Sequence, residues 1–311
     1  MKLVFFDDFK LGVVNGGNVV DVGAAVSGIV HTSPQDLINQ VIANFSQHRA
    51  AIQSAADSGQ GKPLDQVRLR SPLPAPGNIV CMAVNYMEDG TLPAPAPINA
   101  FHKASNTVIG DGDSMVLTDI PAGIFEGEAE LGVVIGKRAS HVREADAMDY
   151  IFGYVNFIDG SARGIPPDTN VFFQAKSRDT FSPIGPFLVT ADEVDDPQKL
   201  QIQLWVNGDL MQNFNTDDMA HKIPRLVEWT SSIHTLEPGD IIASGTNHGG
   251  LNPFQDGDLV ELEIEGMGRL RINIRDDLKR TWARITRRQH TESGLEGRFT
   301  PQLTGKYAPG N

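Results

Sequence analysis

The glutamates Glu126, Glu128 and Glu130 form the densest carboxylate cluster in the sequence, and an apolar run ending at Ile135 follows them. In an extended strand, residues two positions apart point to the same face, so Glu128 and Glu130 could converge on one point. Neighbouring carboxylates repel each other unless a cation lies between them, and hard oxygen ligands suit magnesium, manganese or calcium. The spacing permits a divalent-metal site, although a solvated acidic strand start is favoured for this cluster taken alone.

Two further groups could belong to the same chemistry. Asp159 ends the mostly apolar run that begins at Gly153, which should form a buried strand. Lys176 could neutralise a substrate carboxylate or an enolate oxygen beside a metal. Each has an ordinary explanation, since a strand-end aspartate is commonly a cap or turn residue and a lone lysine commonly lies at the surface.

The run from Gly239 to Gly250 predicts a buried strand that enters a glycine-rich loop. Such a loop can bring backbone amides and the hydroxyl of Thr246 close to a ligand, because glycine permits close backbone approach. The run lacks the lysine spacing of a phosphate-binding loop. Nucleotide binding is therefore not predicted.

The elements that must position these residues begin with a small β-rich N-terminal domain, 1–72. Apolar residues on either side of Asn15-Gly16 predict a hairpin. Ser33 and Pro34 then predict the start of one amphipathic helix that continues through Ile52. The proline-rich connector 71–77 marks the predicted boundary.

The remainder, 73–285, is predicted to be a mainly β catalytic domain. Apolar alternation predicts strands at 202–206, 260–264 and 270–274, and helical patterns are confined to 223–233 and 277–288. A polar tail, 286–311, should pack on a partner subunit or be mobile. Arg284, Arg287 and Arg288 near its start are read as a solvated helix face or an interface.

Composition limits the partners. The formal net charge of −13 opposes non-specific binding to nucleic acid or an anionic membrane, and no apolar run is long enough to cross a bilayer. The single cysteine, Cys81, excludes an intramolecular disulfide and lies in an apolar run, as a buried structural thiol would. The apolar start of the chain is too short for a signal peptide, so we expect a cytoplasmic protein.

Together and in this order, these segments resemble the fumarylacetoacetate hydrolase superfamily. The resemblance covers about residues 79–274 and rests on the segments 79–86, 101–113, 128–137, 153–163, 176–186 and 204–246. It implies an α+β, mainly β fold: a rolled, barrel-like mixed-sheet catalytic domain beside the small N-terminal domain. It also implies a homodimer and a small acidic substrate.

By this resemblance, Glu128, Glu130 and Asp159 bind a divalent metal, Mg²⁺ or alternatively Mn²⁺ or Ca²⁺. Lys176 matches the active-site lysine of the family, and Thr246 matches a substrate-binding threonine. Substrate contacts are also expected from Gly245, Tyr86 and Lys103. The implied metal acts as a Lewis acid on an enolate formed when a C–C bond breaks.

The sequence departs from the family at the water-activating group. Hydrolytic members commonly have a histidine three residues after the Asn-Tyr pair, where this chain has Asp89. An aspartate of ordinary pKa is a weak base at neutral pH, so Asp89, its neighbour Glu88 or the loop residue His248 must replace the histidine. His102 is a further candidate.

Three functions follow from these observations. The leading one is hydrolysis of an acylpyruvate or 1,3-diketo acid in the catabolism of an aromatic compound or a sugar acid. The first alternative keeps the metal-bound enolate but needs no water: decarboxylation, isomerisation or tautomerisation of a 2-oxo acid of the oxaloacetate or hydroxymuconate type. The second is a non-catalytic metabolite-binding protein, against which the intact carboxylates and Lys176 argue.

Overall fold

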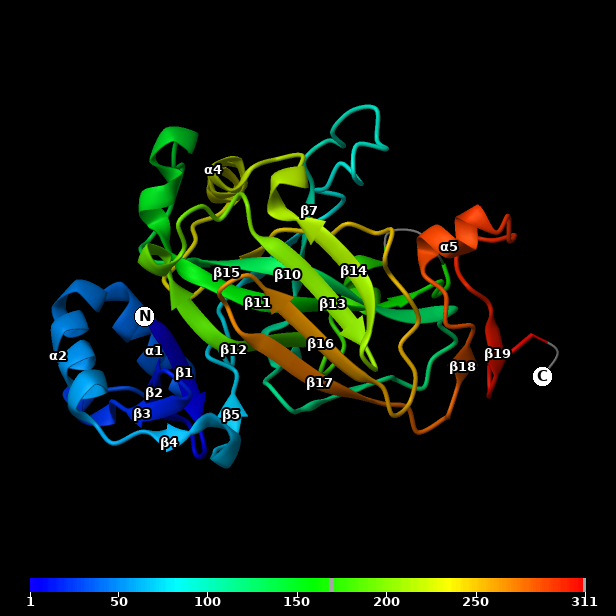
Figure 1. The fold of residues 1–311 in the computed structure, drawn as a ribbon. Helices are drawn as coiled ribbons and strands as arrows, with labels where there is room; N and C mark the ends of the chain where they lie inside the picture. The colour runs from blue at the N-terminus through cyan, green and yellow to red at the C-terminus, as the bar shows by residue number, and fades with distance from the viewer. Residues whose placement is uncertain (168–170, 310–311) are drawn as a thin grey trace.

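Long antiparallel strands form the centre of the protein, whose computed structural model describes residues 1–167 and 171–309 (Figure 1). These are β10 (Ile124–Ile135), β11 (Ile151–Arg163) and β12 (Ser182–Thr190), which pair in sequence order. Nearly every residue of the three strands is buried, on both faces of the sheet. They therefore provide a rigid platform for the side chains that they carry.

The three strands belong to a twelve-stranded mixed sheet with the path β4-β3-β2-β1-β12-β11-β10-β15-β6-β7. Off this path, β5 pairs with β1, and β8 pairs with β12. The other nine strands are β1 (Lys2–Phe6), β2 (Lys10–Asn15), β3 (Asn18–Asp21), β4 (Lys62–Pro63), β5 (Leu69–Arg70), β6 (Ile79–Met82), β7 (Ala100–Lys103), β8 (Val108–Ile109) and β15 (Ile241–Ala243). Cys81 lies on β6 and is a buried free thiol, as its apolar context predicts.

A second sheet packs against β10, β11 and β12 and lies in front of them in Figure 1. It has the order β14-β13-β16-β17-β9, with β13 (Gln201–Val206), β14 (Asp209–Asn215), β16 (Leu259–Ile264), β17 (Arg269–Arg275) and β9 (Ser114–Val116). The buried positions of β13, β16 and β17 alternate, as the sequence predicts, because one face covers the core. A two-stranded ribbon, β18 (Thr281–Trp282) and β19 (Gln302–Thr304), lies near the C-terminus.

The N-terminal segment, blue in Figure 1, combines the predicted hairpin with helices that pack on it. Ser33 caps the first helix by accepting a hydrogen bond from the Asp36 amide. The prediction of one helix was wrong, because the chain breaks at Asn44 into α1 (Pro34–Ala43) and α2 (Phe45–Ser58). Strand β1 pairs with β12, so this segment extends the main sheet, and the division into domains at residue 72 stays a prediction.

Few helices interrupt the strands. The predicted helix at 223–233 is α4 (Ile223–Ile233), and the others after α2 are the short α3 (Phe172–Lys176) and α5 (Arg287–Glu292). Short 3₁₀ turns occupy Gly23–Val26, Leu64–Gln66, Ser105–Thr107, Glu144–Tyr150, Ala191–Glu193 and Thr216–Asp218. The mainly β fold class is confirmed, and no described helix has the length and apolarity to cross a membrane.

The prediction of a helix at 277–288 was wrong. Asp276 and the fully buried Arg280 are four residues apart, which is helical spacing, but they close a turn. Arg280 Nε donates to one carboxylate oxygen of Asp276 at 2.9 Å, and Nη2 donates to the other at 2.9 Å. Strand β18 then follows, and only residues from Arg287 onward are helical.

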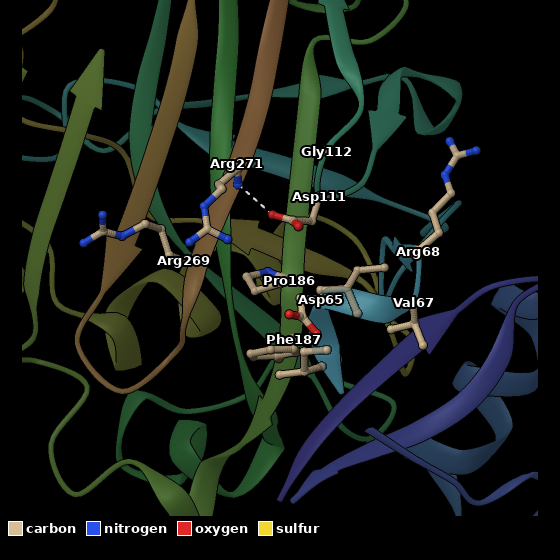
Figure 2. A pocket seen from close by; sticks show the side chains of 11 residues that line it. Asp65, Val67, Arg68, Asp111, Gly112, Pro186, Phe187, Arg269 and Arg271 are labelled. Carbon is tan, nitrogen blue, oxygen red and sulfur yellow. Dashed lines mark hydrogen bonds between the residues drawn. The ribbon is translucent and has the colours of Figure 1, made fainter. Parts of the chain in front are cut away.

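A cavity of about 520 Å³ lies where the N-terminal segment meets the second sheet (Figure 2). Arg68, Asp111, Phe187 and Arg271 are among the residues lining it, and the Arg271 amide donates to Asp111. Burial raises the pKa of Asp111. None of the predicted site residues lines this cavity.

Candidate active site

The predicted acidic cluster lies in the middle of the central hairpin. Glu128 on β10 pairs directly with Asp159 on β11, and Glu130 is two residues further along the same face. One oxygen from each carboxylate can be chosen so that all lie within 4.8 Å of one another, and all three residues are buried. The convergence expected from strand alternation is therefore present, although β10 begins at Ile124 and β11 continues to Arg163, so neither group lies at a strand end.

Gly127, between Glu126 and Glu128, lets another segment of the chain pack closely against β10. A Cβ atom built on Gly127 would lie 2.4 Å from the ring of Phe254 on the opposite face. The absence of a side chain lets the segment containing Phe254 pack directly on β10, and the Phe254 amide donates to the Phe125 carbonyl at 2.8 Å.

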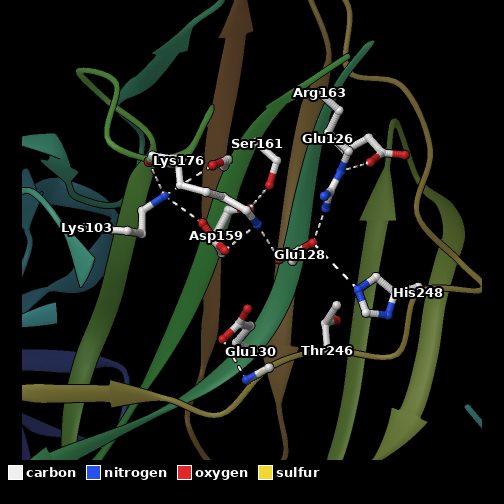
Figure 3. A network of polar contacts seen from close by, with 12 residues as sticks. Lys103, Glu126, Glu128, Glu130, Asp159, Ser161, Arg163, Lys176, Thr246 and His248 are labelled. Carbon is white, nitrogen blue, oxygen red and sulfur yellow. Dashed lines mark hydrogen bonds and ion pairs between the residues drawn. The ribbon is translucent and has the colours of Figure 1, made fainter. Parts of the chain in front are cut away.

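Glu128 lies between two cations (Figure 3). Lys176 Nζ donates to its Oε2 at 2.7 Å, and the guanidinium of Arg163 binds its Oε1. Burial alone would raise the pKa of Glu128, but the charges of Lys176 and Arg163 outweigh burial and hold it well below its usual range. The carboxylates in turn raise the pKa of Lys176, against the opposite effect of burial.

Glu130 is in the opposite electrostatic state. Its Oε2 accepts a hydrogen bond from the Gly245 amide at 2.8 Å, but it makes no ion pair with any residue in the described part of the chain. Burial, followed by the charges of Asp159 and Glu128, raises the pKa of Glu130 well above its usual range. The cluster therefore contains one carboxylate whose charge is not compensated.

Asp159 is held by two lysines. Lys176 Nζ donates to its Oδ2 at 2.6 Å, and Lys103 Nζ donates to its Oδ1 at 2.6 Å. Lys103 also donates to the carbonyls of Gly160 and Lys176, so its three N–H bonds are all used within the protein. The ammonium of Lys103, predicted to contact the substrate, therefore has no N–H left for a substrate in this structure. It positions Asp159 instead.

The glycine-rich loop after β15 places Thr246 beside the cluster (Figure 3). Gly245 adopts a φ of +86°, a conformation that glycine tolerates and that lets its amide reach Glu130. Gln212, on β14, donates to Thr246 Oγ1 and to the Asn247 carbonyl, both at 2.8 Å, and accepts from the Ala129 amide. Because Thr246 Oγ1 accepts this bond, its own O–H remains available as a donor.

A histidine and a glutamate face each other at the edge of the site. His248 Nδ1 lies 2.5 Å from Glu88 Oε1, and the His248 amide donates to Glu88 Oε2 at 2.9 Å. The other ring nitrogen, Nε2, lies 3.9 Å from Glu128 Oε1. Asp89 instead turns outward, where its Oδ2 accepts from Arg288 Nη2 at 2.9 Å.

A chain of buried ion pairs connects the cluster to the C-terminal segment. Arg163 binds Glu128 with Nη2 and Glu126 with Nε, the latter at 2.6 Å. Arg287 Nε also donates to Glu126, at 3.0 Å, and its Nη2 binds the second oxygen. Arg284 and Arg288 are exposed, as the prediction of a solvated face implies, and pair with Asp258 and Asp89. Arg287 is different, because its side chain is only 22% exposed and pairs with the buried Glu126.

Other predicted residues lie outside the immediate cluster. Tyr86 is fully buried and packs edge-on against Phe214, with ring centroids 5.0 Å apart. His102 precedes Lys103 on β7 and therefore points to the opposite face, toward His234. Sequence reasoning did not single out Gln212 and gave Arg287 no part in the site, because strand alternation and charge patterning do not reveal which distant atoms they meet.

The donor set fits a hard divalent cation. It consists of buried carboxylate oxygens, the ligands that magnesium and manganese prefer. Burial, and then the charges of Asp159 and Glu128, keep the pKa of Glu130 raised although Lys176 opposes them, and a bound cation would favour the ionised carboxylate. The side chains of Glu128, Glu130 and Asp159 would hold the ion.

Comparison with known proteins places this geometry in a family. Residues 78–275 match the profile described as "Fumarylacetoacetate (FAA) hydrolase C-terminal". Maleylpyruvate hydrolase of Aquipseudomonas alcaligenes is 35% identical over 291 residues, covering 88% of this chain and 99% of that protein. An oxaloacetate tautomerase of Bacillus subtilis (strain 168) is 37% identical over 223 residues, covering 68% of this chain and 74% of that protein.

The solved structures agree. Maleylpyruvate hydrolase from Sphingobium sp. SYK-6, in complex with manganese (II) ion and pyruvate, superposes with a TM-score of 0.81 at 35% identity and covers 89% of this chain and 99% of that one. Because the family profile spans residues 78–275 and both maleylpyruvate hydrolases are covered over 99% of their length, the chain belongs to the fumarylacetoacetate hydrolase family.

Proposed function

We propose that this protein is a divalent-metal-dependent hydrolase that cleaves a C–C bond of a small acylpyruvate or related 1,3-diketo acid. The observation that carries the proposal is the Glu88–His248 pair, which lies beside the carboxylate cluster and supplies a candidate for the missing water-activating group. Similarity to two maleylpyruvate hydrolases, one of them described with manganese and pyruvate, supports the same reaction class.

The proposed metal ligands are Glu128, Glu130 and Asp159. A bound Mg²⁺ or Mn²⁺ would supply Lewis-acid stabilisation of the enolate that forms as the C–C bond breaks. Lys176, with its ammonium on two of the carboxylates, is placed to add positive charge near the same oxygens. The free O–H of Thr246 can donate to a substrate oxygen.

The buried charges of the site support an anionic bound species. The acids are Glu126, Glu128, Glu130 and Asp159, and the cations are Lys103, Lys176, Arg163 and Arg287. Acids and cations of this network are equal in number, so a divalent ion would leave two positive charges, of which the carboxylate of Glu88, beside the neutral His248, would offset one. Pyruvate in its enolate form carries two negative charges, one on the carboxylate and one on the enolate oxygen.

His248 is the proposed general base. Glu88 fixes the ring by binding Nδ1, which leaves Nε2 directed toward Glu128. Nε2 lies 3.9 Å from Glu128 Oε1. A substrate water at this edge would donate its proton to Nε2 and attack the carbonyl carbon distal to the pyruvoyl group. Glu88 would stabilise the resulting imidazolium, while Asp89 is engaged with Arg288.

Tautomerisation of a 2-oxo acid is the second candidate function, and the similarity to oxaloacetate tautomerases favours it. The same imidazole could remove a proton from carbon instead of water. The two functions differ in their products, because hydrolysis of an acylpyruvate releases pyruvate and a second acid, whereas tautomerisation releases neither.

The test is turnover of purified protein with 2,4-dioxopentanoate and, separately, oxaloacetate, each with Mg²⁺, Mn²⁺ or EDTA. We expect metal-dependent release of pyruvate from 2,4-dioxopentanoate and at least a tenfold loss of kcat in His248→Ala, within the usual range for a general base. Calorimetric Mn²⁺ binding should persist in His248→Ala. Metal-dependent tautomerisation of oxaloacetate without any cleavage of 2,4-dioxopentanoate would reject hydrolysis in favour of the second candidate.

A further inference from the structure

Two histidines lie against each other at the β7 edge of the main sheet. His102 is on β7, the last strand in the path of that sheet, and His234 directly follows α4. Their ring centroids are 5.3 Å apart, with 41° between the ring planes. The pair lies outside the candidate active site, because His102 points away from the face of β7 that carries Lys103.

The hydrogen bonding of His234 leaves one ring nitrogen without a partner. Nδ1 lies 3.0 Å from the Thr235 carbonyl oxygen. A carbonyl can only accept, so Nδ1 carries the hydrogen, and in the neutral ring Nε2 has an unprotonated lone pair. This Nε2 is buried and has no hydrogen-bond partner in the part of the chain that the structure describes. A buried polar atom without a partner costs free energy, and a bound ion is one way to satisfy it.

His102 supplies a second nitrogen ligand. Its ring lies against that of His234, and its ring nitrogens form no hydrogen bond within residues 1–167 and 171–309. Burial, and next the neighbouring His234, lower the pKa of His102, so the ring is neutral near pH 7. Neutral imidazole is the form that binds a metal ion. The side chain of His102 is exposed, so a cation can reach the pair from solvent.

The separation of the rings suits a shared transition-metal ion. Zn–N bonds are about 2.0–2.1 Å long, so two imidazoles at a tetrahedral angle on one zinc ion have ring centroids about 5 Å apart. The surroundings also favour a cation. His234 is the C-cap of α4, whose last turn has no basic residue, and the C-terminal end of a helix carries a partial negative charge. The carboxylate of Asp240 acts in the same sense, because it favours positive charge at His102.

We infer that His102 and His234 together bind a transition-metal ion such as Zn²⁺, at a second site separate from the carboxylate cluster. Imidazole nitrogen suits zinc, nickel and copper, whereas Mg²⁺ prefers oxygen, so the two sites should select different cations. No third His, Cys, Asp or Glu in the described part of the chain groups with the pair, so water or a small anion would complete the coordination. The ion would fasten the edge strand β7, whose Lys103 positions Asp159, to the end of α4.

The first experiment counts zinc ions by calorimetric titration of metal-free protein with Zn²⁺. His102→Ala removes an exposed side chain, and His234→Asn removes Nε2 while keeping a donor near the position of Nδ1. Loss of a second-shell partner already weakens metal binding about 10- to 100-fold, so loss of a direct ligand should weaken one zinc equivalent by at least about 100-fold in each variant. The double variant should lose no more zinc than either single variant, because both substitutions remove the same site.

His31→Asn is the matched control. His31 is exposed, and its Nδ1 also faces a backbone carbonyl, that of Ile29, but no second imidazole lies against its ring in the residues that the structure describes. This variant should bind as many zinc ions as the wild type. Glu128→Ala, which removes a proposed ligand of the cluster, should keep the zinc equivalent that His102→Ala loses. Wild-type zinc stoichiometry and affinity in His102→Ala would overturn the inference and assign the bound zinc to other residues.

Thermal unfolding gives a second measurement, because an ion that binds only the folded state raises Tm. In saturating Mg²⁺, Zn²⁺ at about 100 times its Kd should raise the Tm of the wild type by several degrees, and the rise should be absent in His102→Ala. An equal rise in both proteins would reject the site. The inference does not rest on the proposed function: a protein that binds zinc through the pair but shows no metal-dependent turnover would refute the proposed hydrolysis alone.

Discussion

The ion pair between Arg287 and Glu126 should contribute strongly to stability, and replacement of Arg287 by methionine tests this. Methionine keeps most of the apolar stem but removes the charge. The side chain of Glu126, which is fully buried, is then left with Arg163 as its one cationic partner among the residues that the structure describes. Breaking a buried ion pair by removing one partner costs about 3–5 kcal/mol. Because Arg163 remains and Arg287 is 22% exposed, we expect about 3 kcal/mol, the lower end of that range.

The neighbouring Arg288 provides the control. Its partner is Asp89, and the two side chains are 57% and 49% exposed, so Arg288→Met should cost less than about 1 kcal/mol. Urea unfolding of the wild type and both variants, compared through midpoint and slope, measures the difference. Equal destabilisation by the two substitutions would refute the reasoning from burial.

The same pair has a dependence on pH. Burial alone would raise the pKa of Glu126, but the charges of Arg163 and Arg287 outweigh it and lower the pKa. A carboxylate with a lowered folded-state pKa contributes stability that is present above its unfolded pKa and is lost as the pH falls through the folded pKa. The gap between the wild type and Arg287→Met should therefore narrow as the pH falls below about 4.5, the ordinary value for glutamate.

Other predictions concern the metal and the loop beside it. Burial and its acidic neighbours raise the pKa of Glu130, so metal binding should release a proton from it. The calorimetric enthalpy of metal binding should then vary with the ionisation enthalpy of the buffer. A binding enthalpy that is independent of the buffer would contradict this prediction. Glu128→Ala should abolish metal binding and turnover together, and unchanged Mn²⁺ affinity in that variant would reject the proposed ligand set. Gln212→Leu removes the bonds that fix Thr246 and the Asn247 carbonyl, so it should raise KM while retaining Mn²⁺ affinity; a KM equal to that of the wild type would mean that the loop holds its position without Gln212.

Periodicity identified the features that depend on local geometry. Alternation along one strand was enough to predict that Glu128 and Glu130 share a face, and it also located β13, β16 and β17. The opposition of Glu128 and Asp159 depends on hairpin register, which the sequence alone does not specify. The family resemblance supplied that juxtaposition, which the structure shows.

The errors arose where side chains override local pattern. The i, i+4 spacing of Asp276 and Arg280 imitates a helix, but the bidentate pair between them closes a turn. Arg287 of the C-terminal segment resembles a solvated residue because its carboxylate partner, Glu126, is 161 residues away in the sequence. No local signal reveals such partners.

The order of strands in the main sheet also has a consequence for synthesis on the ribosome. Strand β1 cannot pair with β12 until about 190 residues have been synthesised, because Lys2 pairs with Val189. The β10–β11 hairpin, in contrast, can form from neighbouring segments. The nascent chain therefore carries an unpaired strand edge, and Glu128 and Asp159 lack one of their cations, before Lys176 has emerged. Such intermediates are prone to aggregate. Slower synthesis or added chaperones should therefore raise the yield of folded protein in heterologous production more than the stability of the finished protein would suggest.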